Sequence, residues 1–210
     1  MTENAVHQTK KESHLIFKVE ADCLPEFFGL LQGGFSLATT HCGRSVRTFL
    51  KNELGLTDDY ISQRISTLFL DGMPVDDIDT AVVQNGSRLA LSSAMPGLVG
   101  ATMRQGSPLA ALRDTISYKT AETREGGNGQ ICLKLFNLIM SDIGPHILGR
   151  GIIVRPESLK EFLKRHGDMV NRCSQIQLNG SACSPEALQH ALSSAEAETI
   201  CLTVCAEKRC

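Results

Sequence analysis

Apolar and polar positions alternate most clearly over residues 65–91, ISTLFLDGMPVDDIDTAVVQNGSRLAL. Thr67–Leu70 combines apolar, aromatic and β-branched side chains, which favours a buried or half-buried strand. Asp71-Gly72 and Asn85-Gly86 are turn signals, because glycine, asparagine and aspartate tolerate a positive φ at little steric cost. The pattern therefore predicts a strand, a turn, a short crossover, a second turn and a closing strand.

The residues before this stretch predict the remaining elements of one small sheet unit. Ser45 is a suitable N-cap for a helix, because a serine hydroxyl can accept a hydrogen bond from a free amide of the first turn. Residues 56–64 are expected to form a loop. The expected elements are strands at His14–Glu20 and Phe35–His41, and helices at Leu24–Leu31 and Val46–Leu54.

The segment Lys119–Gly129, KTAETREGGNG, is polar, charged and then glycine-rich, which predicts a linker. After it the order of the first half recurs with looser spacing, and PESLKEFLKRH parallels SVRTFLKNEL down to a shared Phe-Leu-Lys. Two interpretations stay open: an internal structural repeat, or the alternation that any small α+β domain would show. The recurring strands are Ile131–Phe136, Ile152–Val154, Gln175–Gly180 and Thr199–Cys205, and the helices are Leu138–Leu148, Pro156–His166 and Ser184–Ser194.

The order strand, strand, helix, strand, crossover, strand is that of a β-grasp, or ubiquitin-like, domain. The helix VRTFLKNELGL, the turn LFLDGMPVDD and the close QNGSRLALSSAMPG resemble the sulfur-carrier proteins of molybdopterin and thiamine synthesis over residues 14–98. The resemblance implies a sheet whose last strand lies at the centre, parallel to the first. Sulfur carriers end in a Gly-Gly tail whose carboxylate is adenylated and thiolated, whereas this chain continues beyond 95–100 without that tail.

These patterns predict an α+β protein with two β-grasp-like (ubiquitin-like) domains, each a mixed sheet packed on a helix. The first domain is expected at 14–118 and includes a C-terminal loop and a helix at Leu109–Ile116. The second is expected at 130–210, after the linker at 119–129. Residues 1–13 are polar and are expected to form a disordered lead.

The composition of the chain limits the classes of partner that we expect. Apolar residues make up 42% and charged residues 21%, as in ordinary globular proteins, and the net charge of −2 provides no basic field for nucleic acid or anionic lipid. The chain has no Trp and 2 Tyr, so an aromatic platform for single strands is not expected. No apolar window approaches the ~20 residues that span a bilayer, and the polar start lacks a signal-peptide core. We therefore expect a cytoplasmic protein whose partners are neither nucleic acid nor membrane.

The first candidate site is His41 with Cys42, at a strand end before a helix. Helix amides and the neighbouring Arg44 would favour the thiolate of Cys42, and His41 could act as a base. The alternative is a turn with a partly buried cysteine, which the lack of an identifiable third partner favours.

A second candidate is the glycine-spaced segment over 95–106, MPGLVGATMRQG. Its amides and Arg104 could hold a phosphate or carboxylate, or its apolar residues could engage a protein or a second copy of the chain. The alternative is an exit loop that packs on its neighbour. The candidate binding residues are Met95, Pro96, Gly97, Leu98, Val99, Gly100, Arg104 and Gly106.

The chain has 8 cysteines, which without a signal segment are best explained as small buried residues. Cys201, Cys205 and Cys210 could gather a soft metal, but no C-x-x-C pair is present. The sequence therefore predicts neither a metal nor a cofactor.

No catalytic motif is recognisable, which favours a non-catalytic role. We expect a protein-binding or scaffold module that uses its sheet edges and the 95–106 segment, with a protein partner or a second copy of the chain. One alternative is a sulfur-carrier-related or thiol-chemistry protein. The other is a small-anion or nucleotide binder at the 95–106 segment.

Overall fold

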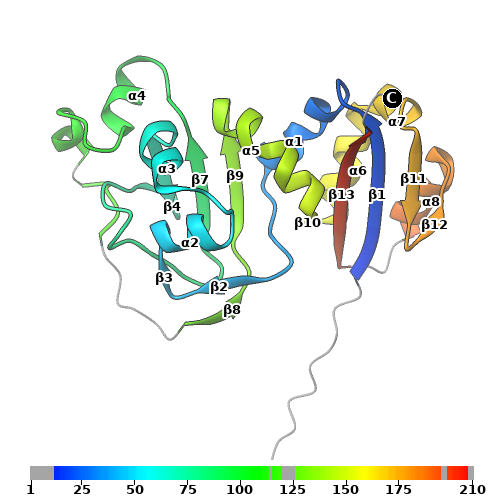
Figure 1. Cartoon of the computed structure of the whole chain (residues 1–210), viewed down its shortest axis with the longest axis horizontal. Coiled ribbons are helices and arrows are strands. Elements are labelled where there is room, and N and C mark those ends of the chain that lie inside the picture. Colours follow the sequence, from blue (N-terminus) through cyan, green and yellow to red (C-terminus); the bar gives the residue numbers. More distant parts are fainter. Residues whose placement is uncertain (1–11, 114, 120–125, 195–197, 208–210) are drawn as a thin grey trace, which may run out of the picture.

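The computed structural model describes residues 12–113, 115–119, 126–194 and 198–207, and it is α+β. Two mixed sheets lie side by side with helices α1 and α5 between them (Figure 1). The strands are β1 (Glu12–Glu20), β2 (Thr40–Cys42), β3 (Arg44–Ser45), β4 (Thr67–Leu70), β5 (Met73–Pro74), β6 (Val82–Val83), β7 (Arg88–Ser92), β8 (Gly127–Gly129), β9 (Cys132–Phe136), β10 (Ile152–Val154), β11 (Gln175–Leu178), β12 (Ser181–Ala182) and β13 (Thr199–Glu207). The α-helices are α1 (Phe28–Gly33), α2 (Val46–Asn52), α3 (Asp58–Arg64), α4 (Gly97–Met103), α5 (Asn137–Arg150), α6 (Pro156–Arg165), α7 (Gly167–Asn171) and α8 (Pro185–Ser194), and the 3₁₀ helices are η1 (Leu24–Phe27) and η2 (Ala110–Arg113).

The first sheet has the order β5-β4-β7-β9. Strand β4 is antiparallel to β5 and β7, and β7 is parallel to β9, with Leu89 beside Leu133. Leucines on one face of these strands are buried. On the other face Phe69, Ala90 and Lys134 are partly exposed, whereas Thr67 and Ser92 at the strand ends are buried. The strand expected at 67–70 and the closing strand are confirmed.

The second sheet has the order β10-β13-β1-β11-β12, so the N-terminal strand lies in its middle. β1 is parallel to β13 and antiparallel to β11. The expectation that His14–Glu20 belongs to the sheet of residues 67–92 is therefore wrong, and β9 takes the place parallel to β7 instead. The reason is physical: period-2 alternation specifies a buried face but not the partner strand. Each sheet therefore contains strands from both of the expected domain ranges, 14–118 and 130–210.

A continuous apolar core joins the two sheets. Phe27 of η1 lies 5.4 Å from Phe17 of β1 and 5.6 Å from Phe162 of α6, measured between ring centroids. Phe35 exchanges backbone hydrogen bonds with Leu133 of β9, and the next residue exchanges them with Ile153 of β10. The predicted strand at 35–41 is thus reduced to these two bridges and β2, because this segment links two sheets instead of extending one.

The helices expected at 24–31, 46–54, 138–148, 156–166 and 184–194 are confirmed with shifted ends. Ser45 caps α2, since its side chain accepts a hydrogen bond from the Thr48 amide at 3.3 Å. The loop expected at 56–64 is wrong, because α3 begins there after Thr57, which caps the Tyr60 amide at 3.2 Å. The helix expected at 109–116 is only the short η2.

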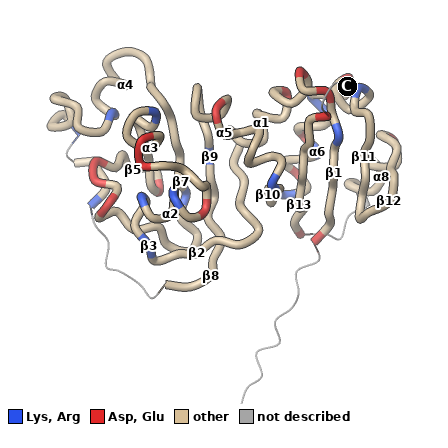
Figure 2. The backbone as a smooth tube through the Cα atoms, viewed as in Figure 1, with Lys and Arg blue, Asp and Glu red and all other residues tan. Residues whose placement is uncertain are grey.

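Strands occupy part of the predicted lead and part of the predicted linker. Glu12 and Ser13 already belong to β1, and residues 1–11 lie outside the described part of the chain. Strand β8 at the end of the predicted linker pairs with β2, and residues 120–125 lie outside the described part. Among the described residues, no helix has the length and apolar character needed to cross a membrane. Acidic and basic residues are interspersed over both halves (Figure 2).

Candidate functional site

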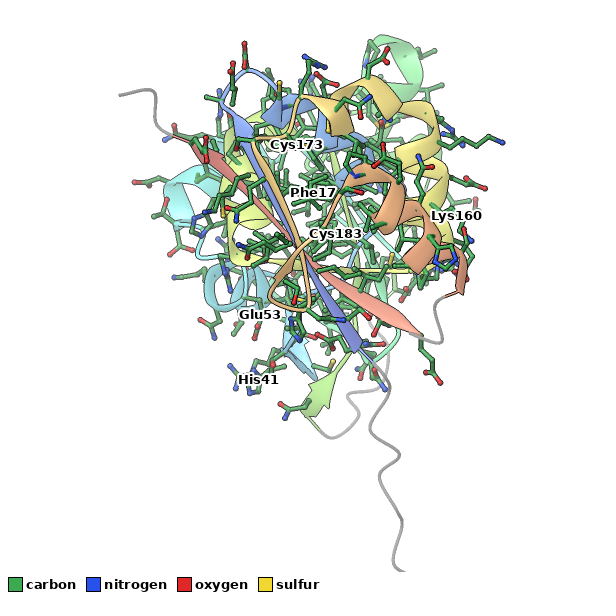
Figure 3. All side chains as sticks on the ribbon, turned by 90° about the vertical axis from the view of Figure 1, so that its right-hand side faces the viewer. Phe17, His41, Glu53, Lys160, Cys173 and Cys183 are labelled. Atoms are coloured by element: carbon green, nitrogen blue, oxygen red, sulfur yellow. The ribbon has the colours of Figure 1, made fainter. Side chains whose placement is uncertain are left out.

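His41 and Cys42 are neighbours in β2, so their side chains lie on opposite faces of the strand, with His41 exposed and Cys42 buried. Glu53 accepts hydrogen bonds from the His41 backbone amide at 3.3 Å and contacts its Nδ1 at 3.2 Å, and Figure 3 shows both side chains at one end of the molecule. Cys42 is 5% exposed, and Gly129 of β8 lies so close that a Cβ there would meet its Sγ at 2.5 Å. Burial and the Glu53 charge both raise the pKa of Cys42. The environment therefore disfavours a thiolate at Cys42.

Cys201 and Cys205, two of the three cysteines considered as soft-metal ligands, do not lie together. Cys201 and Cys205 lie on the same face of β13, opposite His14 and Lys18 respectively, and residues four apart in a strand are roughly 13 Å apart. Cys210 lies outside the described residues. Burial, with a smaller effect of the Glu12 charge, raises the pKa of Cys201.

The 95–106 segment is not a loop, because its centre forms helix α4. Leu98 and Val99 are 71% and 62% exposed on this helix. Gly100 is buried so tightly that a Cβ would lie 1.8 Å from the carbonyl oxygen of Met95. The helix follows a Pro96 N-cap with no side-chain hydrogen bond, and the segment ends with Gly106 at φ 61°.

A pocket of about 560 Å³ opens on the exposed face of the first sheet, and its volume lies in the range of small-ligand sites. Its surface is mostly apolar. The lining comes from β4, β7 and β9, the turn after β4, the segment before α4 and the start of α5. The lining residues are Phe69, Asp71, Gly72, Arg88, Leu89, Ala90, Ser92, Met95, Pro96, Lys134, Phe136 and Asn137.

The register of β4, β7 and β9 explains why the sheet surface is hollow at the pocket. Phe69 of β4, Ala90 of β7 and Lys134 of β9 are direct cross-strand neighbours, so they form one row across the exposed face. The small side chain of Ala90 leaves space between its larger neighbours. Phe136, opposite Ser92, supplies a second half-buried ring. The floor of the pocket is therefore formed by neighbouring side chains of the sheet.

The charged side chains that line the pocket differ in their partners. Asp71 accepts hydrogen bonds from the Arg88 backbone amide at 2.7 Å and from the Ser87 hydroxyl at 3.1 Å. Among the described residues, no carboxylate forms an ion pair with the side chain of Arg88 or Lys134. Arg88 and Lys134 outnumber the single carboxylate of Asp71 in the lining, and this net positive charge favours an occupant that carries an acidic group.

Asn137 fixes the wall of the pocket. It adopts a positive φ of 54°, which is uncommon for a residue with a side chain. Its Nδ2 donates to the Ser92 hydroxyl at 2.9 Å and to the carbonyl of Ala94 at 2.5 Å. These bonds tie the chain leaving β7 to the start of α5, and this places Met95 and Pro96 beside the pocket.

The structure therefore brings Met95 and Pro96 of the predicted segment into the pocket and leaves Leu98, Val99 and Arg104 outside its lining. Phe69 and Phe136 were not among the residues predicted for a site, although each follows a buried leucine in its strand and so points to the more exposed face. That they share one pocket depends on β9 lying beside β7, which no local signal specifies.

No family model, curated protein or solved structure matches this chain.

Proposed function

We propose that the protein is a non-catalytic binding module whose binding site is the pocket over β4, β7 and β9. The observation that carries the proposal is an open apolar hollow with two aromatic rings and two cations free of ion pairs among the described residues. The occupant this chemistry favours is an apolar group next to an acidic group.

A protein segment suits the site better than a small ligand. Met95 and Pro96 at the pocket lead directly into α4, where Leu98 and Val99 are strongly exposed. A chain segment could fill the pocket with one side chain and cover α4 with the next, whereas a small ligand would leave α4 exposed. Strand addition at the sheet edges is less favoured, because the edge strands β5 and β12 have two residues each. The other two edge strands, β9 and β10, are already bridged by Phe35 and Ser36.

We also infer that each sheet is a variant of the β-grasp plan. In the second sheet the support is a central parallel pair, β1 with β13, flanked by antiparallel strands. In the first sheet it is the parallel pair β7 with β9, in which β7 is flanked by the antiparallel strand β4 and β9 forms the sheet edge. Thiol chemistry has less support, because Cys42 is buried and Gly97 and Gly100 lie in a helix rather than in an extended tail. Anion binding over 95–106 has less support, because helix α4 has only seven residues and Arg104, the cation of this segment, lies outside the pocket lining.

Probe binding tests the pocket. Anilinonaphthalene sulfonate, an aromatic ring system with one acidic group, should bind and fluoresce, and N-phenylnaphthylamine, which lacks the sulfonate, should bind more weakly. Ala90→Leu should reduce binding of both probes by filling the hollow, and Lys134→Met should reduce only the sulfonate preference. Leu112→Ala, at a 73% exposed residue of η2 outside the pocket lining, is the control.

Cross-linking then tests the partner class. A photoreactive phenylalanine analogue at Leu98 should capture a protein from native extract, and Ala90→Leu in the same chain should remove that product. A cross-linked product that Ala90→Leu leaves unchanged would contradict the pocket as the binding site. Binding of the sulfonate probe with no product that depends on Ala90 would instead favour a small-molecule ligand.

A further inference from the structure

Three metal-binding side chains meet on the exposed face of the second sheet. Glu12 and His14 are alternate residues of β1 and therefore lie on one face, and Cys201 of β13 is the register partner of His14. One carboxylate oxygen, one imidazole nitrogen and the thiol sulfur all lie within 4.8 Å of one another. Nε2 of His14 lies 3.8 Å from Oε1 of Glu12.

The backbone under this cluster is fixed. The side chain of Asn179 accepts a hydrogen bond from the His14 amide at 2.8 Å, and the Asn179 amide donates to the His14 carbonyl at 2.7 Å. On the other side, the parallel ladder with β13 holds Cys201 beside the histidine. Only side-chain rotations are therefore needed to bring the three ligand atoms closer.

The donor set specifies the class of ion. Imidazole, thiolate and carboxylate together suit a borderline ion such as Zn²⁺, which binds them at about 2.0–2.3 Å. Ligand atoms around a tetrahedral ion at those distances are roughly 3.5 Å apart, so a modest contraction of the present cluster is enough. Two of the ligands are exposed, which leaves the fourth position to water.

We propose that Glu12, His14 and Cys201 form a site for a zinc-class divalent cation. Binding would convert the Cys201 thiol to a thiolate and release its proton to solvent. The ion would join the strand that begins the described chain to the strand that ends it. Its role is that of a staple across the β1–β13 ladder, and this role is independent of the pocket on the other sheet.

The test uses the full chain after dialysis against a chelator. Zn²⁺ titrated by calorimetry should bind with one site, and Co²⁺ should give a thiolate-to-metal absorption band. Cys201→Ser should remove the band, and His14→Asn or Glu12→Gln should weaken binding at least about 10-fold, since even losing a group that only orients a ligand costs that much. Cys205→Ser is the matched control, because Cys205 is on the same face of β13 but opposite Lys18.

A stability measurement distinguishes variants that have lost a metal ligand from variants that have lost affinity because they unfold. Zn²⁺ should raise the urea midpoint of the wild-type protein and of Cys205→Ser, and should leave that of Cys201→Ser unchanged. The proposal is overturned if no saturable binding occurs, if Cys205→Ser removes the band, or if the band persists in Cys201→Ser. Binding that depends on Cys201 but not on His14 or Glu12 would also overturn it, because it would show a lone thiol.

Discussion

Phe17 of β1 lies directly beside Val204 of β13 in a parallel ladder, and both side chains are buried. Parallel strands cannot be joined by a tight turn, so the connection between them must be long. Here it comprises nearly the whole chain, and the C-terminal sheet is incomplete without its N-terminal strand. Figure 3 shows Phe17 within the densely packed side chains of this half.

The segment 130–210 alone should therefore fail to fold. It lacks β1, the strand between β13 and β11, so the facing edges of both neighbours lose their backbone partners and the core loses three buried side chains, those of Leu15, Phe17 and Val19. We expect poor amide dispersion in its ¹H–¹⁵N spectrum, whereas the full chain gives a dispersed one. A well-dispersed spectrum from 130–210 would contradict the requirement for β1 in the C-terminal sheet and support two independent domains.

Within the full chain, Phe17→Ala should lower the free energy of unfolding by about 3–5 kcal/mol, because it removes a fully buried ring. Lys18→Ala, at the next residue on the partly exposed face, should change it by about 0.5 kcal/mol or less. Urea denaturation measures both variants. Equal effects would mean that β1 does not pack as described.

Arg113 should be far more costly to replace than an exposed arginine. It is 2% exposed, donates to both oxygens of Asp76, and donates to the backbone carbonyl of Thr102 at 2.5 Å. Arg113→Ala leaves these acceptors unpaired, and we expect a loss of about 2–4 kcal/mol, reduced from the fully buried case because Asp76 is 43% exposed.

Arg64 is the matched control for Arg113, since it pairs with Asp142 at 2.8 Å while 45% of its side chain is exposed. Arg64→Ala should cost about 1 kcal/mol or less. Urea midpoints of the two variants, at equal slopes, give the comparison. Similar losses for both variants would show that Arg113 does not anchor the end of α4.

The sequence predicted local elements well and strand partners poorly. Ser45 before 46–54 is a cap, and a cap is read from neighbouring residues, so that helix was predictable. HLIFKVE and ICLKLF share one alternating pattern, so nothing local tells which sheet each strand joins. The pocket was missed for the same reason, because Phe69 and Phe136 share it only through the register of β7 with β9.

Stability should fall as the pH rises above about 9. Burial raises the pKa of Cys173 from 9.0 to about 11, so between these values the unfolded chain has lost a proton that the folded chain keeps. Burial and Asp142 raise the pKa of Tyr60 from 10.0 to about 12, which extends the fall to higher pH. Both groups therefore stabilise the folded state less at alkaline pH.

Urea midpoints measured from about pH 8 to pH 11 should decrease. Cys173→Ser should make the part that begins near pH 9 less steep, while the raised pKa values of Cys42 and Cys201 preserve some of it. Cys183→Ser, at another half-exposed cysteine of the same half (Figure 3), should keep the wild-type slope. A midpoint that rises with pH would contradict the direction of both pKa shifts.

Gly100 and Gly149 form a matched pair of helical glycines in α4 and α5. A Cβ at Gly100 would lie 1.8 Å from the Met95 carbonyl oxygen, whereas a Cβ at Gly149 has nothing within 4 Å. Gly100→Ala must displace backbone, and we expect a loss of about 1–3 kcal/mol. It should also weaken binding of anilinonaphthalene sulfonate, because Met95 lines the pocket.

Gly149→Ala should be neutral or stabilise by about 0.4–1 kcal/mol, since alanine reduces the freedom of the unfolded chain without a clash. If Gly100→Ala preserved both the urea midpoint and probe affinity, the contact between α4 and Met95 could not be what holds the wall of the pocket in place.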